Sequence, residues 1–250
     1  MEKVRLDHLL VRRGLAETGA KAQALILAGK VRAPGLKNVK PGEKVRLDQE
    51  IELVADLPYV SRGGEKLAAA LDEFGVTVAG RFCLDVGAST GGFTDCLLQR
   101  GAVGVLAVDV GHGQLHWKLR NDPRVENLEK THARDLTADR VAASAGPALW
   151  PGLLTVVDVS FISLDKVLPA VAGATPPGGE FVALLKPQFE VGPKDVPGGI
   201  VRDDAVREAV LSRVQSQADG WGFRFEKSMV SPLKGRDGNV EYLLHLRKKT

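Results

Sequence analysis

The sequence predicts a mixed α/β protein: a doubly wound, mostly parallel sheet preceded by a small α+β head. From residue 62 onward, apolar runs alternate with helical patterns, which is the order of elements in such a sheet. The apolar runs are continuous rather than alternating, as in strands that helices cover on both faces. Residues 1–50 differ, since they hold 11 Lys and Arg against 6 Asp and Glu, whereas the other 200 residues hold 23 against 25. We therefore expect a basic domain at residues 1–58 and a larger domain at residues 59–250.

The composition excludes several classes of protein. Of the 250 residues, 44% are hydrophobic and only two are cysteines, Cys83 and Cys96, which is too few for a disulfide framework or a cysteine metal site. No apolar run reaches the length of a transmembrane helix, and the N-terminus lacks the apolar core of a secretory signal. We expect a soluble, cytoplasmic protein that holds no metal.

Two short helices are predicted at the start of the head. Leu6, Leu9 and Leu10 share one face of the first helix, and Thr18 is placed to cap the second. The segment after them alternates apolar and polar residues between turn residues, as short strands do. Basic side chains on the polar side of these elements are candidates for contacts with a polyanion, although charge alone fits a solvated face equally well. They are Arg5, Arg12, Arg13, Lys21, Lys30 and Arg32.

Six strands are predicted in the larger domain. Four buried strands are expected at 81–87, 103–110, 153–159 and 180–186, and an antiparallel pair at 223–233 and 239–249. An amphipathic helix in YVSRGGEKLAAALDEFG precedes the first strand. The Gly- and Pro-rich segment after residue 186 is expected to be a loop beside the ligand site, ending at a helix capped by Asp203 or Asp204.

A glycine-rich loop follows the first buried strand in LDVGASTGGFTDCLLQRGA. Its glycines allow the backbone to approach a ligand closely, and the helix after it presents its N-terminus. Asp109 ends the next strand, 24 residues after Asp85, where an acid can bind ribose hydroxyls. Loop, acid and strand context together favour a nucleoside cofactor over a structural turn. The candidate residues are Asp85, Gly87, Ala88, Ser89, Thr90, Gly91, Gly92, Phe93 and Asp109.

A lysine ends the fourth buried strand in FVALLKPQFEVG: Lys186 follows an unbroken apolar run and precedes Pro187. Asp158 ends the strand before it, and ligands bind beyond the carboxyl ends of such strands, so both are expected at the rim that carries the glycine loop. Lys66 in the amphipathic helix and Glu241 near the last strand complete a candidate set of four. Taken singly, these residues also fit a surface lysine, a structural ion pair and a solvated acid.

Both predicted domains of this chain resemble known protein families. The loop G-x-x-x-G-G after an aspartate resembles the S-adenosylmethionine (SAM) loop of class I methyltransferases, which have a Rossmann-like fold. The order Lys66, Asp158, Lys186, Glu241 matches the K-D-K-E tetrad of FtsJ-like RNA ribose 2′-O-methyltransferases, and SRGGEKL, GQLHWKLR, DVSFISL, GGIVRD and GNVEYLL are similar to the hemolysin A-type branch of that family. The head pattern RLDxxLxxRGLAxxxxKAQxLIxxGxV resembles the S4 RNA-binding fold, with departures at Gly19 and at residues 33–35.

The resemblance implies methylation of a ribose 2′-hydroxyl, of cytidine in ribosomal RNA, with SAM as cofactor. It implies that Lys186 accepts the proton of the hydroxyl or orients the hydroxyl. Asp158 and Lys66 would position Lys186 and the ribose, and Glu241 would complete the network. It places Asp135 near the adenine and assigns the basic head to RNA. Oligomeric state stays open.

Other interpretations compete with this one. The chain could be a noncatalytic RNA-binding protein with a structural SAM site, a small-molecule methyltransferase, or a membrane-lytic protein, although no amphipathic basic helix of the required kind is evident. His112 and His116 stand four residues apart, but no third metal ligand accompanies them. Trp117 is expected to pack internally rather than to stack on a base.

Overall fold

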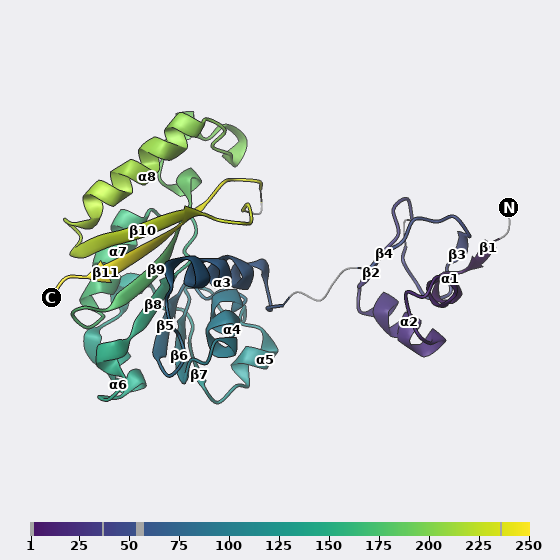
Figure 1. The fold of residues 1–250 in the computed structure, drawn as a ribbon, viewed down its shortest axis with the longest axis horizontal. Helices are drawn as coiled ribbons and strands as arrows, with labels where there is room; N and C mark the ends of the chain where they lie inside the picture. The colour runs from purple at the N-terminus through teal and green to yellow at the C-terminus, as the bar shows by residue number, and fades with distance from the viewer. Residues whose placement is uncertain (1–2, 37, 54–57, 236) are drawn as a thin grey trace. The chain divides into compact units, whose positions relative to one another are not determined.

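The computed structural model describes residues 3–36, 38–53, 58–235 and 237–250. The chain divides into two compact units, Met1–Leu57 and Pro58–Thr250 (Figure 1). Each unit has a hydrophobic core of its own.

The smaller unit packs two helices with two short two-stranded sheets. Val4, Leu36 and other apolar residues surround a core in which Leu6, Leu9 and Leu10 meet Ala22 and Ile26 across the two helices. The side chain of Thr18 accepts a hydrogen bond from the backbone of Lys21 at 3.2 Å, which confirms the predicted cap. The elements are β1 (Lys3–Arg5), α1 (Leu6–Arg12), α2 (Gly19–Leu27), β2 (Val31–Arg32), β3 (Lys44–Arg46) and β4 (Glu52–Leu53), with β1 antiparallel to β3 and β2 to β4.

A buried carboxylate joins the two helices of the smaller unit. Asp7 on α1 is fully buried, and its side chain accepts hydrogen bonds from Arg5 at 2.7 and 3.0 Å, from Gln23 on α2 at 3.0 Å and from the backbone of His8 at 2.9 Å. The Arg5 hydrogen bonds are the main reason why the pKa of Asp7 falls to about 2. This carboxylate therefore stabilises the unit only in its charged form.

We expect Asp7→Asn to lower the free energy of unfolding of the smaller unit by about 1 to 2 kcal/mol at pH 7. Because the pKa of Asp7 in the folded protein lies below its ordinary value, the stabilisation is complete above about pH 5 and is lost as the pH falls toward 2. Calorimetry on the full chain at pH 7 and at pH 3 measures both effects, with Glu17→Gln as the exposed control. A pH-independent difference between Asp7→Asn and the wild type would contradict this role.

The larger unit is built on a seven-stranded sheet in the order β10-β11-β9-β8-β5-β6-β7. The strands β9, β8, β5, β6 and β7 are parallel to one another. β11 is antiparallel to β9, and β10 is antiparallel to β11. All six predicted strands are confirmed, each slightly shorter than predicted. The bounds are β5 (Phe82–Val86), β6 (Gly104–Val108), β7 (Val125–Leu128), β8 (Leu154–Val157), β9 (Glu180–Leu185), β10 (Phe223–Val230) and β11 (Tyr242–Lys248).

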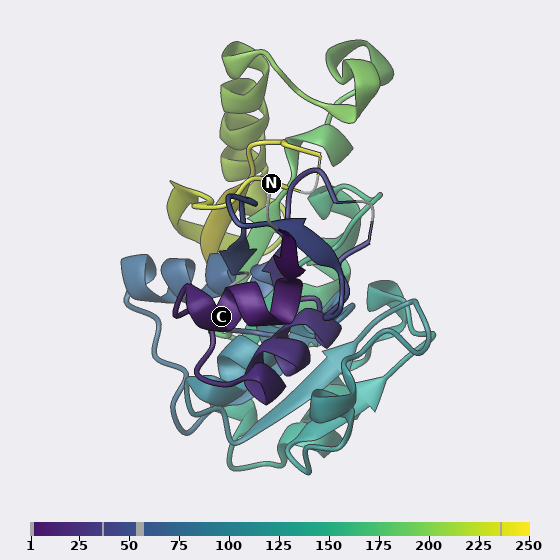
Figure 2. The ribbon, with the colours of Figure 1, turned by 90° about the vertical axis from the view of Figure 1, so that its right-hand side faces the viewer.

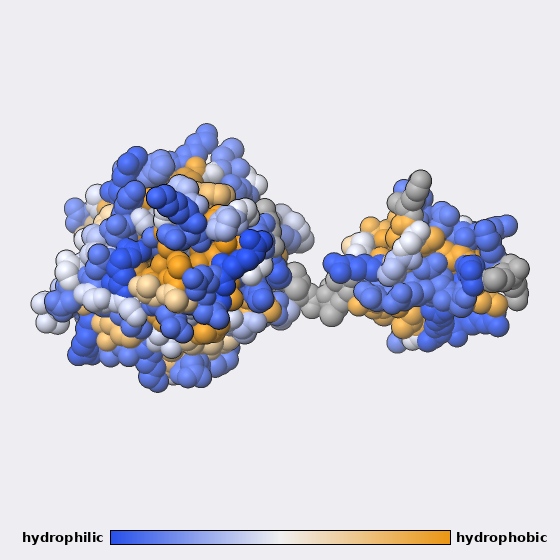
Figure 3. All heavy atoms as spheres, turned by 90° about the horizontal axis from the view of Figure 1, so that it is seen from above, coloured by the Kyte–Doolittle hydropathy of each residue, from blue (hydrophilic) through white to orange (hydrophobic). Residues whose placement is uncertain are grey.

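Helices cover both faces of this sheet (Figure 1). Because successive strand residues point to opposite faces, Cys83 of β5 packs toward α3 and α4, whereas Leu84 and Val86 pack toward α6, α7 and α8. α5 belongs to the first face through Leu119. The helices are α3 (Arg62–Phe74), α4 (Gly92–Gln99), α5 (Trp117–Arg120), α6 (Ala138–Ala145), α7 (Leu164–Gly173) and α8 (Asp204–Ala218). Hydrophilic residues dominate the surface seen in Figure 3, with patches of apolar residues between them.

A loop of short 3-10 turns connects β9 to α8. Its turns are η3 (Pro187–Phe189), η4 (Pro193–Asp195) and η5 (Pro197–Gly199), and Figure 2 shows them with α8 at one edge of the unit. The Asp203 side chain accepts a hydrogen bond from the backbone of Ala205 at 2.9 Å, so Asp203 is the cap of α8. Among the described residues, no helix is long and apolar enough to cross a membrane.

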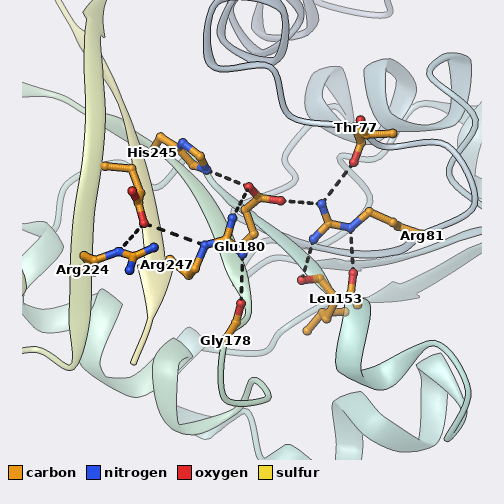
Figure 4. A network of polar contacts seen from close by, with 10 residues as sticks. Thr77, Arg81, Leu153, Gly178, Glu180, Arg224, His245 and Arg247 are labelled. Carbon is orange, nitrogen blue, oxygen red and sulfur yellow. Dashed lines mark hydrogen bonds and ion pairs between the residues drawn. The ribbon is translucent and has the colours of Figure 1, made fainter. Parts of the chain in front are cut away.

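A polar network fastens the amino edge of the sheet (Figure 4). Glu180, the first residue of β9, contacts Arg81 at 2.6 Å, His245 at 2.8 Å and Arg247 at 3.1 Å, and the hydrogen bond to His245 is the main reason why the pKa of Glu180 falls to about 2. The same edge includes the backbone oxygens of Thr77 and Leu153, which accept from Arg81. These charges are satisfied within the protein, so we assign this edge to stability.

The opposite, carboxyl edge is the one at which ligands bind in such folds. The chain places β6 on one side of β5 and later β8 on its other side, and this reversal opens a crevice beyond the strand ends. The residues that directly follow β5, β8 and β9 are Gly87, Asp158 and Lys186. Parallel strands therefore bring to one place three residues that are far apart in the sequence.

Candidate active site

Two adjoining cavities lie at the carboxyl edge of the sheet. The tetrad cavity, of about 400 Å³, is lined by Lys66, Asp158, Lys186 and Glu241. The Asp109 cavity, of about 510 Å³, extends beyond the end of β6. Both share Gly87, Ser89, Asp158, Ser160 and Phe161 as walls. A molecule that spans the two cavities would therefore pass directly over the glycine loop.

The four tetrad residues come together as two ion pairs. Lys186 Nζ lies 2.6 Å from Asp158 Oδ1, and Lys66 Nζ lies 2.5 Å from Glu241 Oε2. Lys66 stands on α3, and Glu241 directly precedes β11. The grouping that the sequence pattern predicted is thus present in space.

The backbone of Lys186 is anchored by β9, and its ammonium group faces the tetrad cavity. The apolar strand β9 ends at Leu185, so the lysine is the first residue beyond the core, and its Nζ also donates to Ser160 Oγ at 2.8 Å. An ammonium has three hydrogens to donate. Ser160 accepts one of these hydrogens, and the ion pair with Asp158 covers a second side of Nζ. The third side is left for a ligand in the cavity.

The Lys66–Glu241 pair is the more deeply buried of the two. Lys66 is 8% exposed and Glu241 is 3% exposed. Gly235 lies against this pair, because a Cβ atom there would come within 2.6 Å of Glu241 Oε1. Buried charges of this kind are tolerated only when they are paired, so each residue holds the other in place.

The glycine loop approaches the end of β8 more closely than a side chain permits. Gly87 has a φ of +88°, and a Cβ atom there would stand 2.4 Å from the backbone oxygen of Asp158. Gly91 has a φ of +94°, and a Cβ atom there would collide with Leu119 at 2.2 Å. The absence of a side chain at Gly87 and Gly91 therefore lets the loop pack closely between the end of β8 and α5. Loop residues that line the tetrad cavity are Gly87, Ala88, Ser89, Thr90, Gly92 and Phe93.

Asp109 marks the far end of the second cavity. Its Oδ2 accepts from the backbone of Ser89 at 2.8 Å, and its Oδ1 accepts from the backbone of Gly111 at 2.6 Å. A carboxylate has about four acceptor positions, so two remain for hydroxyl groups. Apolar side chains form much of the rest of the wall, which fits the flat apolar face of a purine; they include Val86, Val108, Val159, Ile162 and Val167.

Three predicted cofactor residues do not line either cavity. Asp85 is fully buried; its Oδ2 accepts from Thr94 Oγ1 at 2.6 Å, and burial raises the pKa of Asp85 to about 7. Its contacts support a role in holding α4 below the loop. Gly91 serves the packing just described. Asp135 is exposed at the end of a 3-10 turn, while His132 and Ala133 from the same segment line the Asp109 cavity.

Several residues of the site were not singled out from the sequence. Ser160 holds Lys186, and Gln114 lines the Asp109 cavity. Phe161 has a φ of +63° and is 90% exposed, although it borders both cavities. Its ring lies against that of Phe189 at a tilt of 46°, with 5.0 Å between centroids. The signal that could have found them is their place in DVSFISL and GQLHWKLR, two of the segments that resemble the hemolysin A-type branch. An exposed aromatic ring at a cavity mouth suits contact with a planar ligand.

The prediction for Trp117 was wrong. Its side chain is 71% exposed, because Leu119 and Leu115 are the residues of this segment that face the core. His116 caps α5 by accepting from the backbone of Lys118, and His112 pairs with Glu129 at 2.5 Å. The two histidines therefore have separate partners.

The six basic residues of the smaller unit differ in how far they are engaged. Arg5 binds Asp7, and Arg13 donates to the backbone oxygens of Gln49 and Leu47. Arg12, Lys21 and Arg32 are exposed, and Lys30 is half-buried. Arg5 and Arg13 are thus partly committed to the fold, whereas Arg12, Lys21 and Arg32 are exposed and are the stronger candidates for an external anion.

Fold and site together define a methyltransferase. Residues 59–248 match the FtsJ-like methyltransferase family, and the chain belongs to that family. A structure of low similarity agrees with the fold: a candidate SAM-dependent methyltransferase from Listeria monocytogenes shares 17% identity at a TM-score of 0.52, over 76% of this chain and 100% of that one.

Relatives of higher identity extend over the whole chain. It is 49% identical over 251 residues to the 16S/23S rRNA (cytidine-2′-O)-methyltransferase TlyA of Mycobacterium tuberculosis, covering 99% of this chain and 91% of the relative. It is 44% identical over 243 residues to hemolysin A of Brachyspira hyodysenteriae, covering 97% and 99%. A solved structure of a candidate hemolysin from Streptococcus thermophilus has 43% identity and a TM-score of 0.74, covering 100% of this chain and 90% of that one.

Proposed function

We propose that this enzyme transfers a methyl group from SAM to the ribose 2′-hydroxyl of a cytidine in ribosomal RNA. The observation that carries the proposal is the pairing of Lys186 with Asp158 beside the glycine loop, within a family of methyltransferases. The relatives named as rRNA cytidine 2′-O-methyltransferases support the substrate. Action on ribosomal RNA places the enzyme in the cytoplasm.

The residues of the two cavities fit SAM. Asp109 offers acceptors for ribose hydroxyls, the apolar wall offers a surface for adenine, and the glycine loop lies between them and the tetrad. When bound, SAM supplies a methyl group on a positively charged sulfur. The loop residues that we assign to it are Gly87, Ala88, Ser89, Thr90, Gly92 and Phe93.

The tetrad provides what attack by a hydroxyl requires. A ribose hydroxyl is a weak nucleophile at neutral pH, so it must be aligned with the methyl group and must lose its proton. Lys186 donates to the hydroxyl oxygen or accepts its proton, while Asp158 and Ser160 fix the direction of Nζ. The methyl group of bound SAM would pass to the hydroxyl oxygen, and its sulfur would keep the electron pair. The hydroxyl proton would pass to Nζ of Lys186 in its neutral amine form, or to water where Lys186 orients the hydroxyl as an ammonium. Lys66, held by Glu241, positions the ribose from the other side.

The smaller unit supplies the second part of the proposal. We assign residues 1–58 to an S4-like RNA-binding domain. Arg12, Lys21 and Arg32 contact phosphates in it, and Arg5, Arg13 and Lys30 lie at the border of this contact. The excess of positive charge over the first 50 residues supports this assignment. The larger unit, residues 59–250, then carries the chemistry.

We expect Asp109→Ala to raise the dissociation constant for SAM about 10- to 150-fold, because a hydrogen bond to a charged group contributes about 1.5 to 3 kcal/mol. Titration calorimetry on the full chain measures this. Asp135→Ala is the matched control, since Asp135 is exposed and does not line the cavity. If Asp135→Ala weakens SAM binding as much as Asp109→Ala does, our placement of the nucleoside is wrong.

The function itself is tested by transfer of labelled methyl groups from SAM to separated ribosomal subunits and to naked ribosomal RNA. We expect label in RNA from at least one of these substrates. Binding of SAM and RNA without transfer would instead support the noncatalytic RNA-binding protein. Transfer to free nucleosides by a chain that lacks residues 1–58 would support a small-molecule methyltransferase.

A further inference from the structure

Gln188 is a polar residue in the tetrad cavity that the chemistry above does not use. It lies in the 3-10 turn η3, two residues after Lys186 and directly before Phe189, and its side chain lines the cavity. Among the described residues, its Oε1 atom has no hydrogen-bond donor, and water does not reach it. A buried acceptor without a donor is unusual in a folded protein. It is expected where a ligand supplies the missing donor.

The neighbours of Gln188 indicate what kind of ligand that is. Lys186, which acts on the ribose, precedes Gln188 by two residues, and Phe189 follows it directly. The Phe189 ring makes a tilted contact with that of Phe161, and both residues line the cavity. The Nζ atom of Lys186 lies 6.0 Å from the centroid of the Phe189 ring, so the base of a nucleotide whose ribose lies at Lys186 can reach the aromatic rings. A base that leaves its stack is read by hydrogen bonds at its pairing edge and by stacking on aromatic side chains.

We propose that Gln188 selects the base of the target nucleotide, with Oε1 accepting a hydrogen bond from the exocyclic amino group of cytosine. This inference rests on the proposed function. Cytosine carries an amino donor at the position where uracil carries an oxygen acceptor. Because no hydrogen bond from the residues that the structure describes holds the amide, a small turn of the side chain presents Oε1 to the base. Uracil presents an oxygen at that position, which Gln188 can meet with Nε2 only when the amide is turned over, and Oε1 is then again left without a donor.

The geometry of the turn supports a reading role. Pro187 has a fixed φ angle and is buried, so the backbone between Lys186 and Gln188 is constrained. The Phe189 amide donates to the carbonyl oxygen of Lys186 at 2.9 Å, which closes the turn. The turn therefore fixes the backbone positions of Lys186, which acts on the ribose, and Gln188, which reads the base, relative to each other. A base that cannot pair with Gln188 draws its ribose away from Lys186.

The test compares base preference with catalysis in the full-length enzyme. The methylated nucleotide is first mapped with the wild type, and that nucleotide is then changed from cytidine to uridine in rRNA presented in the same form. We expect the wild type to prefer cytidine at least 10-fold in kcat/KM. Gln188→Met keeps the shape but has no acceptor, and it should bring the preference close to one, chiefly by lowering transfer to cytidine. Gln188→Glu keeps an acceptor and should keep the preference.

Two controls separate a reading role from a structural one. The dissociation constant for SAM should change less than twofold in both Gln188 variants, and Gln217→Ala, an exposed change on α8, should leave kcat/KM and the base preference unchanged. An equal loss with cytidine and uridine in Gln188→Met, or no loss with either, would overturn the assignment of Gln188 and leave the proposed function intact. Failure of the wild type to methylate any rRNA would overturn the proposed function and this inference with it.

Discussion

Replacing Lys186 by alanine is expected to lower the rate of methyl transfer about 100- to 10,000-fold, the range for loss of a positioned proton-transfer group. The affinity for SAM should change little, because Lys186 does not line the Asp109 cavity. Lys186→Arg should fail as well, since a planar guanidinium cannot take the place of a single Nζ held between Asp158 and Ser160. Single-turnover transfer of labelled methyl to rRNA measures both rates.

The control for this prediction lies in the same loop. Lys194 stands eight residues after Lys186 and is exposed, and Lys194→Ala should keep most of the activity. A Lys186→Ala enzyme that retains more than half of the wild-type rate would remove this lysine from the chemistry. The ion pair with Asp158 would then be structural.

Removing either partner of the Lys66–Glu241 pair is expected to affect folding and activity together. The partners are 2.5 Å apart and nearly covered, so Lys66→Ala or Glu241→Ala leaves a buried charge without its counterion, at a cost of about 3 to 5 kcal/mol. For a unit of this size the Tm should fall by roughly 6 to 20 °C. Thermal unfolding and methyl transfer on the same samples measure the two effects.

A double variant separates the structural effect from the catalytic one. Lys66→Met with Glu241→Leu replaces both charges by apolar groups and should recover most of the Tm, while methyl transfer stays low because Lys66 no longer contacts the ribose. Glu73→Ala, an exposed change on the same helix, should alter neither. A double variant that recovers activity along with stability would limit this pair to a structural role.

The sequence pattern predicted the parts of this fold that depend on burial. Continuous apolar runs revealed the strands that helices cover on both faces, and residues at the ends of those strands, such as Asp158 and Lys186, met at one rim because parallel strands end together. β7 had no such signal. It lies at the edge of the sheet, and its residues Val125–Leu128 include half-buried and exposed side chains.

Residues whose roles depend on loop geometry could not be predicted in this way. Phe161 has a left-handed backbone that carries its ring outward, and an apolar residue next to a strand is otherwise expected to be buried. Gln188 was singled out because its Oε1 atom is buried without a hydrogen-bond donor. Only the packing around η3 in the structure reveals this. Asp85 precedes the glycine loop, yet strand direction turns it into the core rather than toward a ligand.

The position of the methyl group in the product tests the central claim most directly. RNA methylated by the wild-type enzyme is digested to nucleosides and analysed by mass spectrometry, in which loss of the ribose tells a methylated sugar from a methylated base. Our account predicts 2′-O-methylcytidine, absent from RNA treated with Lys186→Ala. A methyl group on a base would contradict it, because Lys186, Asp158, Lys66 and Glu241 would then be arranged around a ribose oxygen that the enzyme does not modify.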